Sequence, residues 1–389
     1  MKIPFSGRAH AYLPEEIDAV SEFMSLRDTM TQGEHLHAFQ SEFQKFLATD
    51  AKCFAVGSAA DALEITAMLL QIKPGDEIIV PAHTYTASVA PFVKAGAVIR
   101  WADIDPGNRV VSASTVIPLI SSKTKAILVV HLYGFVVDVG EIQKTIEGSS
   151  IQLIEDCAQS IGARLNGVRS GASSNFAIFS FHSHKNMSTL GEGGMLLVAD
   201  PKIAAVVPKI RHNGHASYVR QNNDYWLPAM SDVVMPTLNG EIIWPGNFCL
   251  SEVSCLVGRK LLARVDQMNA IKRSRALDII DELRQNSELE FHREDSERHN
   301  YHLLVAKMRG GKRDSLIRKL FNDFDIQCAI QYCPLYRYDL YKKAGFGDTN
   351  LPHTDEFYDN MVSFPFNQTL SDDEINYMVG AIKTSLASI

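Results

Sequence analysis

The sequence predicts an α/β protein with a large layered domain followed by a smaller α+β domain. Three observations support this fold class: a length of 389 residues, short apolar runs that alternate with helix-length segments, and a change of composition near residues 260–285. A chain of this length exceeds one hydrophobic core, so two domains are expected. We place the large domain at residues 1–262 and the small C-terminal domain at residues 263–389.

Two helices are expected before the first strand. The first opens at Pro14 with two glutamates after it, and a break at residues 31–33 separates it from the second. Both have apolar residues at helical spacing, which we interpret as scaffold. The stripes are Ile17, Val20 and Phe23 in the first helix and Phe39, Phe43 and Phe46 in the second.

Seven apolar runs follow, mostly separated by helix-length segments. This alternation predicts a mainly parallel, seven-stranded sheet with helices on both faces, a three-layer α/β/α arrangement. Such sheets bind ligands beyond the carboxyl ends of their strands, so the loops after the runs are the candidate sites. The runs lie at 53–57, 77–81, 97–101, 126–131, 151–154, 176–181 and 194–198.

The first such loop, residues 57–61, is built of small residues and leads directly into a helix. Small side chains at Ala59 and Ala60 let a phosphate approach the free N–H groups, and the helix dipole adds about 0.3–1 kcal/mol. A helix that is merely capped by Ser58 or Asp61 explains the same residues equally well.

Two further strand ends carry candidate residues. Tyr85 follows the second run, where its ring could stack on a planar cofactor, although a core or rim tyrosine is the more ordinary interpretation. Asp156 follows the fifth run, and a buried carboxylate there needs a positive partner such as a pyridinium nitrogen. Taken alone, Asp156 is more simply a helix cap.

Lys185 is the central candidate. It lies in the segment 175–194, NFAIFSFHSHKNMSTLGEGG, where an apolar strand leads into a glycine-rich turn. Partial burial of an amine beyond a strand end lowers its pKa and frees the nucleophile for Schiff-base chemistry. A lone lysine in such a loop is usually solvated, so this interpretation depends on its agreement with the other segments.

The C-terminal part has its own elements. An irregular segment from Gly214 to Trp244 is long enough to be a functional loop. We expect a long amphipathic helix at 263–286, a strand at 301–305 and a helix at 312–322. A capping box formed by Ser371 and Glu374 predicts the beginning of the last helix.

Composition excludes several classes of function. The chain is 46% apolar and 21% charged, with a net charge of -7 and no basic cluster, so neither nucleic acid nor an anionic membrane is an expected partner. Six scattered cysteines without a C-x-x-C pair or a signal peptide indicate the reducing cytoplasm, with neither disulfides nor a metal site. The longest apolar runs are far shorter than a membrane span.

Together these segments resemble the DegT/DnrJ/StrS-type sugar aminotransferases, which are fold-type-I enzymes that use pyridoxal 5′-phosphate (PLP). Ser180-Phe-His-Ser-His-Lys185 with Gly191-Glu-Gly-Gly194 matches the family signature S-F-H-x-x-K…G-E-G-G. The resemblance extends over nearly the whole chain, from residues 31–33 to the closing helix. It implies a fold-type-I large domain and a homodimer.

The resemblance also implies roles for individual residues. Lys185 would attach covalently to PLP and later carry the proton between cofactor and substrate carbons. Asp156 would pair with the ring nitrogen and keep it protonated. Tyr85 would stack on one face of the ring, and Gln159 would lie against the other. The phosphate would be held by Ser180, by the amides of Ala59 and Ala60, and by Asn247 of the neighbouring subunit.

The implied reaction is transamination from an amino acid, usually L-glutamate, to a keto sugar for a surface glycan or lipopolysaccharide. The acceptor is either a nucleotide-linked keto-deoxyhexose or an 8-oxo derivative of 3-deoxyoctulosonate. Three features depart from the family pattern: Ala60, Cys249 and the length of segment 214–245. They leave undecided, in that order, one phosphate contact, one anion contact and the shape of the acceptor pocket. Alternatives are a PLP-dependent sugar dehydratase, which lysine at 185 disfavours, and a non-catalytic PLP-binding regulator.

Overall fold

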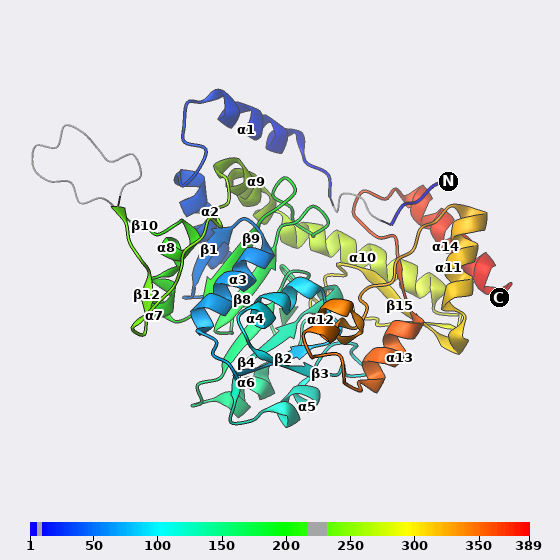
Figure 1. Cartoon of the computed structure of the whole chain (residues 1–389). Coiled ribbons are helices and arrows are strands. Elements are labelled where there is room, and N and C mark those ends of the chain that lie inside the picture. Colours follow the sequence, from blue (N-terminus) through cyan, green and yellow to red (C-terminus); the bar gives the residue numbers. More distant parts are fainter. Residues whose placement is uncertain (6–9, 217–231) are drawn as a thin grey trace, which may run out of the picture.

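The computed structural model describes residues 1–5, 10–216 and 232–389 (Figure 1). In this part of the chain, a seven-stranded sheet has the order β1-β9-β8-β5-β4-β2-β3. β9 is antiparallel to β1 and β8, and the other neighbours are parallel, so the predicted mainly parallel sheet is confirmed. The strands are β1 (Lys52–Val56), β2 (Glu77–Pro81), β3 (Val98–Ala102), β4 (Thr124–Val130), β5 (Gln152–Asp156), β8 (Phe176–Ser180) and β9 (Gly194–Val198).

Alternate residues of the strands face opposite layers of helices. In β8, Phe176 and Ile178 pack in one core with α3 (Ala59–Leu70), whereas Ala177 and Phe179 pack in another with α2 (Glu34–Leu47) and α9 (Glu252–Leu262). The sheet is therefore covered on both faces, as the apolar runs predict. Smaller helices near the sheet are α4 (Ala90–Lys94), α5 (Ala113–Val116), α6 (Gly140–Ile146), α7 (Pro201–Ala204) and α8 (Val207–Arg211).

Glu252 joins α9 to the beginning of α2. Its side chain is 1% exposed, and its two oxygens accept hydrogen bonds from the N–H groups of Gly33, His35 and Leu36 at 2.8, 2.7 and 3.1 Å. The first N–H groups of a helix have no partner inside the helix, so this carboxylate satisfies them from a distant segment. The contact fixes α2 against α9 on one face of the sheet.

The first helix, α1 (Pro14–Ser25), lies at the edge of the molecule (Figure 1). Phe23 is buried as expected, but Ile17 is 58% exposed. The prediction that Ile17 is a packed scaffold residue is therefore wrong, because α1 has solvent on this side. Across the described residues, none of the helices combines the length and apolarity needed to cross a membrane.

The C-terminal part contains a second sheet with the order β14-β15-β16 and its own core. In Figure 1, α10 extends from the large sheet into this part. Ile3 pairs with Ile326 and packs in the same core, so residues near the N-terminus also lie here. The domain boundary at 262/263 stays a prediction. The elements are α10 (Val265–Leu283), β14 (Leu289–Phe291), β15 (Leu304–Met308), α11 (Arg313–Phe324), α12 (Asp339–Lys343), α13 (Pro352–Asn360), β16 (Met361–Phe364) and α14 (Asp372–Leu386).

Two elements of the C-terminal part, the last helix and the strand expected at 301–305, are predicted from the sequence. The capping box of Ser371 and Glu374 is present at α14. The strand expected at 301–305 begins three residues later, at Leu304. Short hairpins complete the described fold: β6 (Arg164–Leu165) with β7 (Val168–Arg169), β10 (His215–Ala216) with β11 (Asp232–Val233), and β12 (Thr237–Leu238) with β13 (Glu241–Ile242).

Candidate active site

A cavity of about 630 Å³ opens where the carboxyl ends of several strands meet the C-terminal part. Its walls include most of the residues that the sequence singles out, namely Ala59, Ala60, Tyr85, Asp156, Gln159, Ser180 and Lys185. From the C-terminal part come Lys272, His302, Gln331, Tyr332 and Phe366. The cavity therefore combines loops of the large sheet with side chains more than 80 residues further along the chain.

Lys185 lies in the turn that follows β8. Its backbone N–H donates to the carbonyl of His182, which closes the turn. The side chain is partly buried in the cavity wall. Burial lowers the pKa of Lys185 to about 8, although the negative charge of Asp156 acts in the opposite direction. A substantial fraction of the amine is therefore neutral and nucleophilic near physiological pH.

Asp156 is the last residue of β5 and is 4% exposed. The Ser88 hydroxyl donates to Asp156 Oδ2 at 2.7 Å, and the Ala158 N–H donates to Oδ1 at 3.0 Å. These bonds orient the carboxylate on the cavity wall. Among the described residues it has no ion-pair partner within 4.0 Å, so its charge calls for a cationic group from a ligand.

The N-terminus of α3 forms another part of the wall. Ser58 is the N-cap, and its hydroxyl accepts from the Asp61 N–H at 3.0 Å, so the capping interpretation of this loop holds. Ala59 and Ala60, in the first turn of this helix, nevertheless line the cavity. A Cβ at Gly194 would lie 2.5–2.7 Å from backbone atoms of Ser58 and Ala59. Glycine at 194 therefore allows β9 to approach the helix end.

Gln159 occupies the centre of a hydrogen-bonded group. Its Oε1 accepts from the Tyr133 N–H at 2.6 Å, and its Nε2 donates to the Tyr332 hydroxyl at 3.1 Å. Tyr85 is 57% exposed, which makes it a rim tyrosine, and its ring centroid lies 6.0 Å from that of Tyr332. The two tyrosines form an aromatic border on the cavity.

Asn247 does not line this cavity. It is exposed, it pairs with His212 in a short bridge, and its Oδ1 accepts from the Cys249 N–H at 3.4 Å. Within one chain, Asn247 therefore makes no contribution to the site, and its expected role for a neighbouring subunit stays a proposal. The expected long loop at 214–245 falls partly on residues 217–231, which lie outside the described residues.

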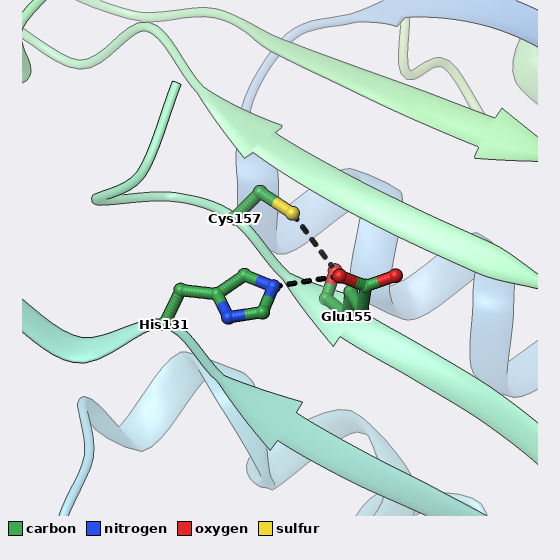
Figure 2. A group of neighbouring side chains, drawn as sticks. All are labelled: His131, Glu155 and Cys157. Atoms are coloured by element: carbon green, nitrogen blue, oxygen red, sulfur yellow. Dashed lines mark hydrogen bonds and ion pairs between the residues drawn. The ribbon is translucent and has the colours of Figure 1, made fainter. Parts of the chain in front are cut away.

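A buried cluster lies beside Asp156, at the ends of β4 and β5 (Figure 2). His131 Nε2 lies 2.7 Å from Glu155 Oε2, and His131 Nδ1 accepts from the Val137 N–H at 3.0 Å. Burial is the largest single effect on Glu155 and by itself would raise the pKa, but the hydrogen bond and charge of His131, together with donors from Gly171 and Ser174, lower the pKa overall. Both ring nitrogens of His131 take part in hydrogen bonds. The cluster of His131, Glu155 and Cys157 therefore connects the ends of the two strands.

Three cavity residues are not predicted from the sequence, although one of them carries a signal there. Ser88 and Tyr332 stand in segments without a chemical motif, and only the folded chain brings them to Asp156 and Gln159. Lys272 does carry a signal: it falls on the buried stripe of α10 that contains Met268 and Ala276. A lysine on the apolar side of an amphipathic helix is unusual and marks a candidate.

Comparison with known proteins now identifies the class. The chain belongs to the DegT/DnrJ/EryC1/StrS aminotransferase family, whose model matches residues 12–383. EryC1 of Saccharopolyspora erythraea, an erythromycin biosynthesis sensory transduction protein, is 29% identical and aligns over 98% of this chain and 99% of its own. The GDP-perosamine synthase of Vibrio cholerae is 29% identical over 97% and 96% of the two chains.

A solved structure gives the same result for the fold. Spr1654 of Streptococcus pneumoniae in its PMP-form is 25% identical, has a TM-score of 0.85 and aligns over 99% of both chains. The same protein has also been solved in a PLP-form. The expected fold-type-I aminotransferase architecture, the enzyme class and the PLP cofactor of the family are thereby confirmed.

The described residues fit PLP in three respects. Asp156 offers a buried, oriented carboxylate without a protein cation, which suits a protonated pyridine nitrogen. Lys185 offers an amine of lowered pKa for the aldehyde. The first turn of α3, which a side chain at Gly194 would obstruct, offers free N–H groups for the phosphate.

Proposed function

We propose that this protein transfers an amino group from L-glutamate to a keto sugar during the synthesis of an amino sugar for a surface glycan or lipopolysaccharide. The observation that carries the proposal is the joint presence of Lys185, Asp156 and the N-terminus of α3 on one cavity wall. We further propose that the enzyme works in the cytoplasm as a homodimer, with Asn247 serving the site of the neighbouring subunit.

When bound, PLP supplies an electron sink that stabilises negative charge on the substrate carbon next to nitrogen. Asp156 keeps the ring nitrogen protonated, and the hydroxyl of Ser88 holds its carboxylate in place. Ser180 and the N–H groups of Ala59 and Ala60 bind the phosphate.

Lys185 performs two tasks in this proposal. Its amine would hold the cofactor, and the same amine would move a proton at the substrate carbon that gains or loses nitrogen. Its pKa of about 8 suits both tasks, since neither the amine nor the ammonium form dominates completely near neutral pH. Tyr85 and Gln159 would hold the ring between them.

The acceptor belongs to one of two chemical classes. The perosamine synthase relative acts on a GDP-linked sugar by its name, which supports a nucleotide-linked keto-deoxyhexose for this chain. A sugar acid, an 8-oxo derivative of 3-deoxyoctulosonate, is the second class. The cavity is lined by the aromatic pair Tyr85 and Tyr332 as well as by polar groups, which are compatible with either class.

A non-catalytic regulator is the competing proposal, because the relative EryC1 is named as a sensory transduction protein. Absorption spectroscopy of the PLP-loaded protein separates the two. An aminotransferase should lose its visible band on addition of L-glutamate as the PMP form accumulates, and a keto sugar should restore it. A spectrum that stays unchanged with L-glutamate and with other amino acids would refute transamination and favour the regulator. Release of water from the sugar without amination would favour the dehydratase.

A further inference from the structure

Lys272, on α10, lines the cavity but has no task in the reaction described above. Its side chain is 2% exposed. Nζ donates to Asn186 Oδ1 at 3.0 Å and to the carbonyl of His302 at 2.8 Å. Both acceptors are neutral, and no described carboxylate pairs with this amine, so burial lowers the pKa of Lys272 to about 7.

The orientation of the two asparagine amides near Lys272 follows from one backbone carbonyl, which can only accept a hydrogen bond. The carbonyl of Ile161 only accepts, so Asn269 donates to it through Nδ2 at 2.8 Å and presents Oδ1 to Asn186. Asn186 donates through Nδ2 to that oxygen at 2.9 Å and must present Oδ1 to Lys272. The side chain of Asn186 therefore holds Lys272 in position without neutralising it.

The charged groups that line the cavity indicate which kind of ligand Lys272 can bind. Among the described residues that line it, the basic side chains are two lysines and three histidines (His182, His184 and His302), and no arginine is present. Lys185 is committed to the cofactor in the proposed function, which leaves Lys272 as the available lysine of this chain. An anionic substrate group would supply the counter-charge that the ammonium lacks.

We propose that Lys272 binds a carboxylate group of a substrate inside this cavity. The inference rests on the proposed function and refines it, because it assigns a residue to an acidic substrate. The carboxylate belongs either to the amino donor or to a sugar-acid acceptor. A bound carboxylate would favour the ammonium form of Lys272, and the charge-assisted hydrogen bond between the two is strong enough to select for that group.

Isothermal titration of the PLP-loaded enzyme tests the proposal with two unreactive probes. Glutarate stands for the donor, and 3-deoxyoctulosonate stands for the sugar acid. Lys272→Gln removes the charge but keeps a hydrogen-bonding side chain, and Lys343→Gln removes an exposed lysine as a control. Lys272→Gln should weaken one probe about 10- to 100-fold, and Lys343→Gln should leave both unchanged.

Each outcome has a defined meaning. Weakening of glutarate assigns Lys272 to the donor, and weakening of the sugar acid assigns it to the acceptor. Unchanged binding of both probes overturns the proposal, even where the variant loses stability. A wild-type crystal soaked with each probe decides the matter if Lys272→Gln does not fold: a carboxylate oxygen within about 3.2 Å of Nζ supports the proposal, and probes bound elsewhere overturn it.

These binding measurements are independent of transamination. If L-glutamate leaves the spectrum of the wild-type enzyme unchanged, the proposed function fails while the titrations still report on Lys272. If L-glutamate is converted and neither probe depends on Lys272, the carboxylate site fails and the proposed function stands.

Discussion

Lys185 and Asp156 line the same cavity, but the surroundings of the two side chains differ. Asp156 is stabilised by two fixed donors, the Ser88 hydroxyl and the Ala158 N–H. Lys185 has no described hydrogen bond from its side chain, and burial lowers its pKa. The fold thus holds the carboxylate in a fixed orientation and makes the amine easier to deprotonate, as covalent attachment of an aldehyde requires.

The lowered pKa of Lys185 predicts a pH-dependent stability of the apoenzyme. The amine has a pKa of 10.5 when solvated and about 8 in the folded chain, so the unfolded state binds more protons between these values. The free energy of unfolding should therefore rise with pH by about 3 kcal/mol between pH 8 and pH 10.5 through this residue.

Urea unfolding of the wild-type and Lys185→Met apoenzymes measures this effect. The variant should be more stable than the wild type by the largest margin near pH 7, and the margin should shrink as the pH rises through 8 toward 10.5. Lys185→Gln should show the same pH dependence, since charge is its cause. A margin that does not vary with pH would contradict the lowered pKa.

At the scale of elements, long-range contacts at helix ends fix the layers. Glu252 belongs to the first turn of α9 but serves the beginning of α2, more than 200 residues earlier in the chain. No local pattern reveals such a pairing. The seven strands, in contrast, follow directly from the sequence, because strands buried on both faces are continuous apolar runs.

Glu252→Gln should lower the free energy of unfolding by about 1.5–3 kcal/mol, because an amide places an N–H₂ group against a buried N–H of α2. Glu34→Gln, an exposed change in the first turn of α2, is the control and should cost less than about 1 kcal/mol. Chemical unfolding monitored by circular dichroism measures both. Equal losses for the two variants would show that the buried contact adds nothing.

The sequence predicts some site residues better than others for a physical reason. Asp156 ends one strand and Lys185 follows another, and the carboxyl ends of both strands meet at one edge of the sheet, so their proximity is a property of the fold class. Ser88 and Tyr332 reach the cavity through tertiary packing, which no local spacing encodes, whereas the helical spacing of α10 marks Lys272 as a buried lysine without showing that it lines the cavity. Ile17 illustrates the opposite error, since helical periodicity alone does not say whether an apolar stripe is covered.

For the whole molecule, the proposed homodimer predicts complementation between two impaired variants. If Asn247 serves the neighbouring site, a mixed dimer of Lys185→Ala and Asn247→Ala chains contains one complete site and one doubly altered site. Subunits mixed after partial unfolding and refolding should regain PLP retention and turnover above either parent. Mixed dimers no more active than the parents would show that Asn247 does not act across the interface.

The central claim is that one amine, Lys185, carries the cofactor. Borohydride reduction of the PLP-loaded enzyme, followed by peptide mass spectrometry, tests this most directly, because reduction makes the attachment permanent. We predict a phosphopyridoxyl label on the peptide that contains Lys185 and no label in Lys185→Ala. A label on Lys272 or another lysine, or no label in a protein that binds PLP, would contradict the account.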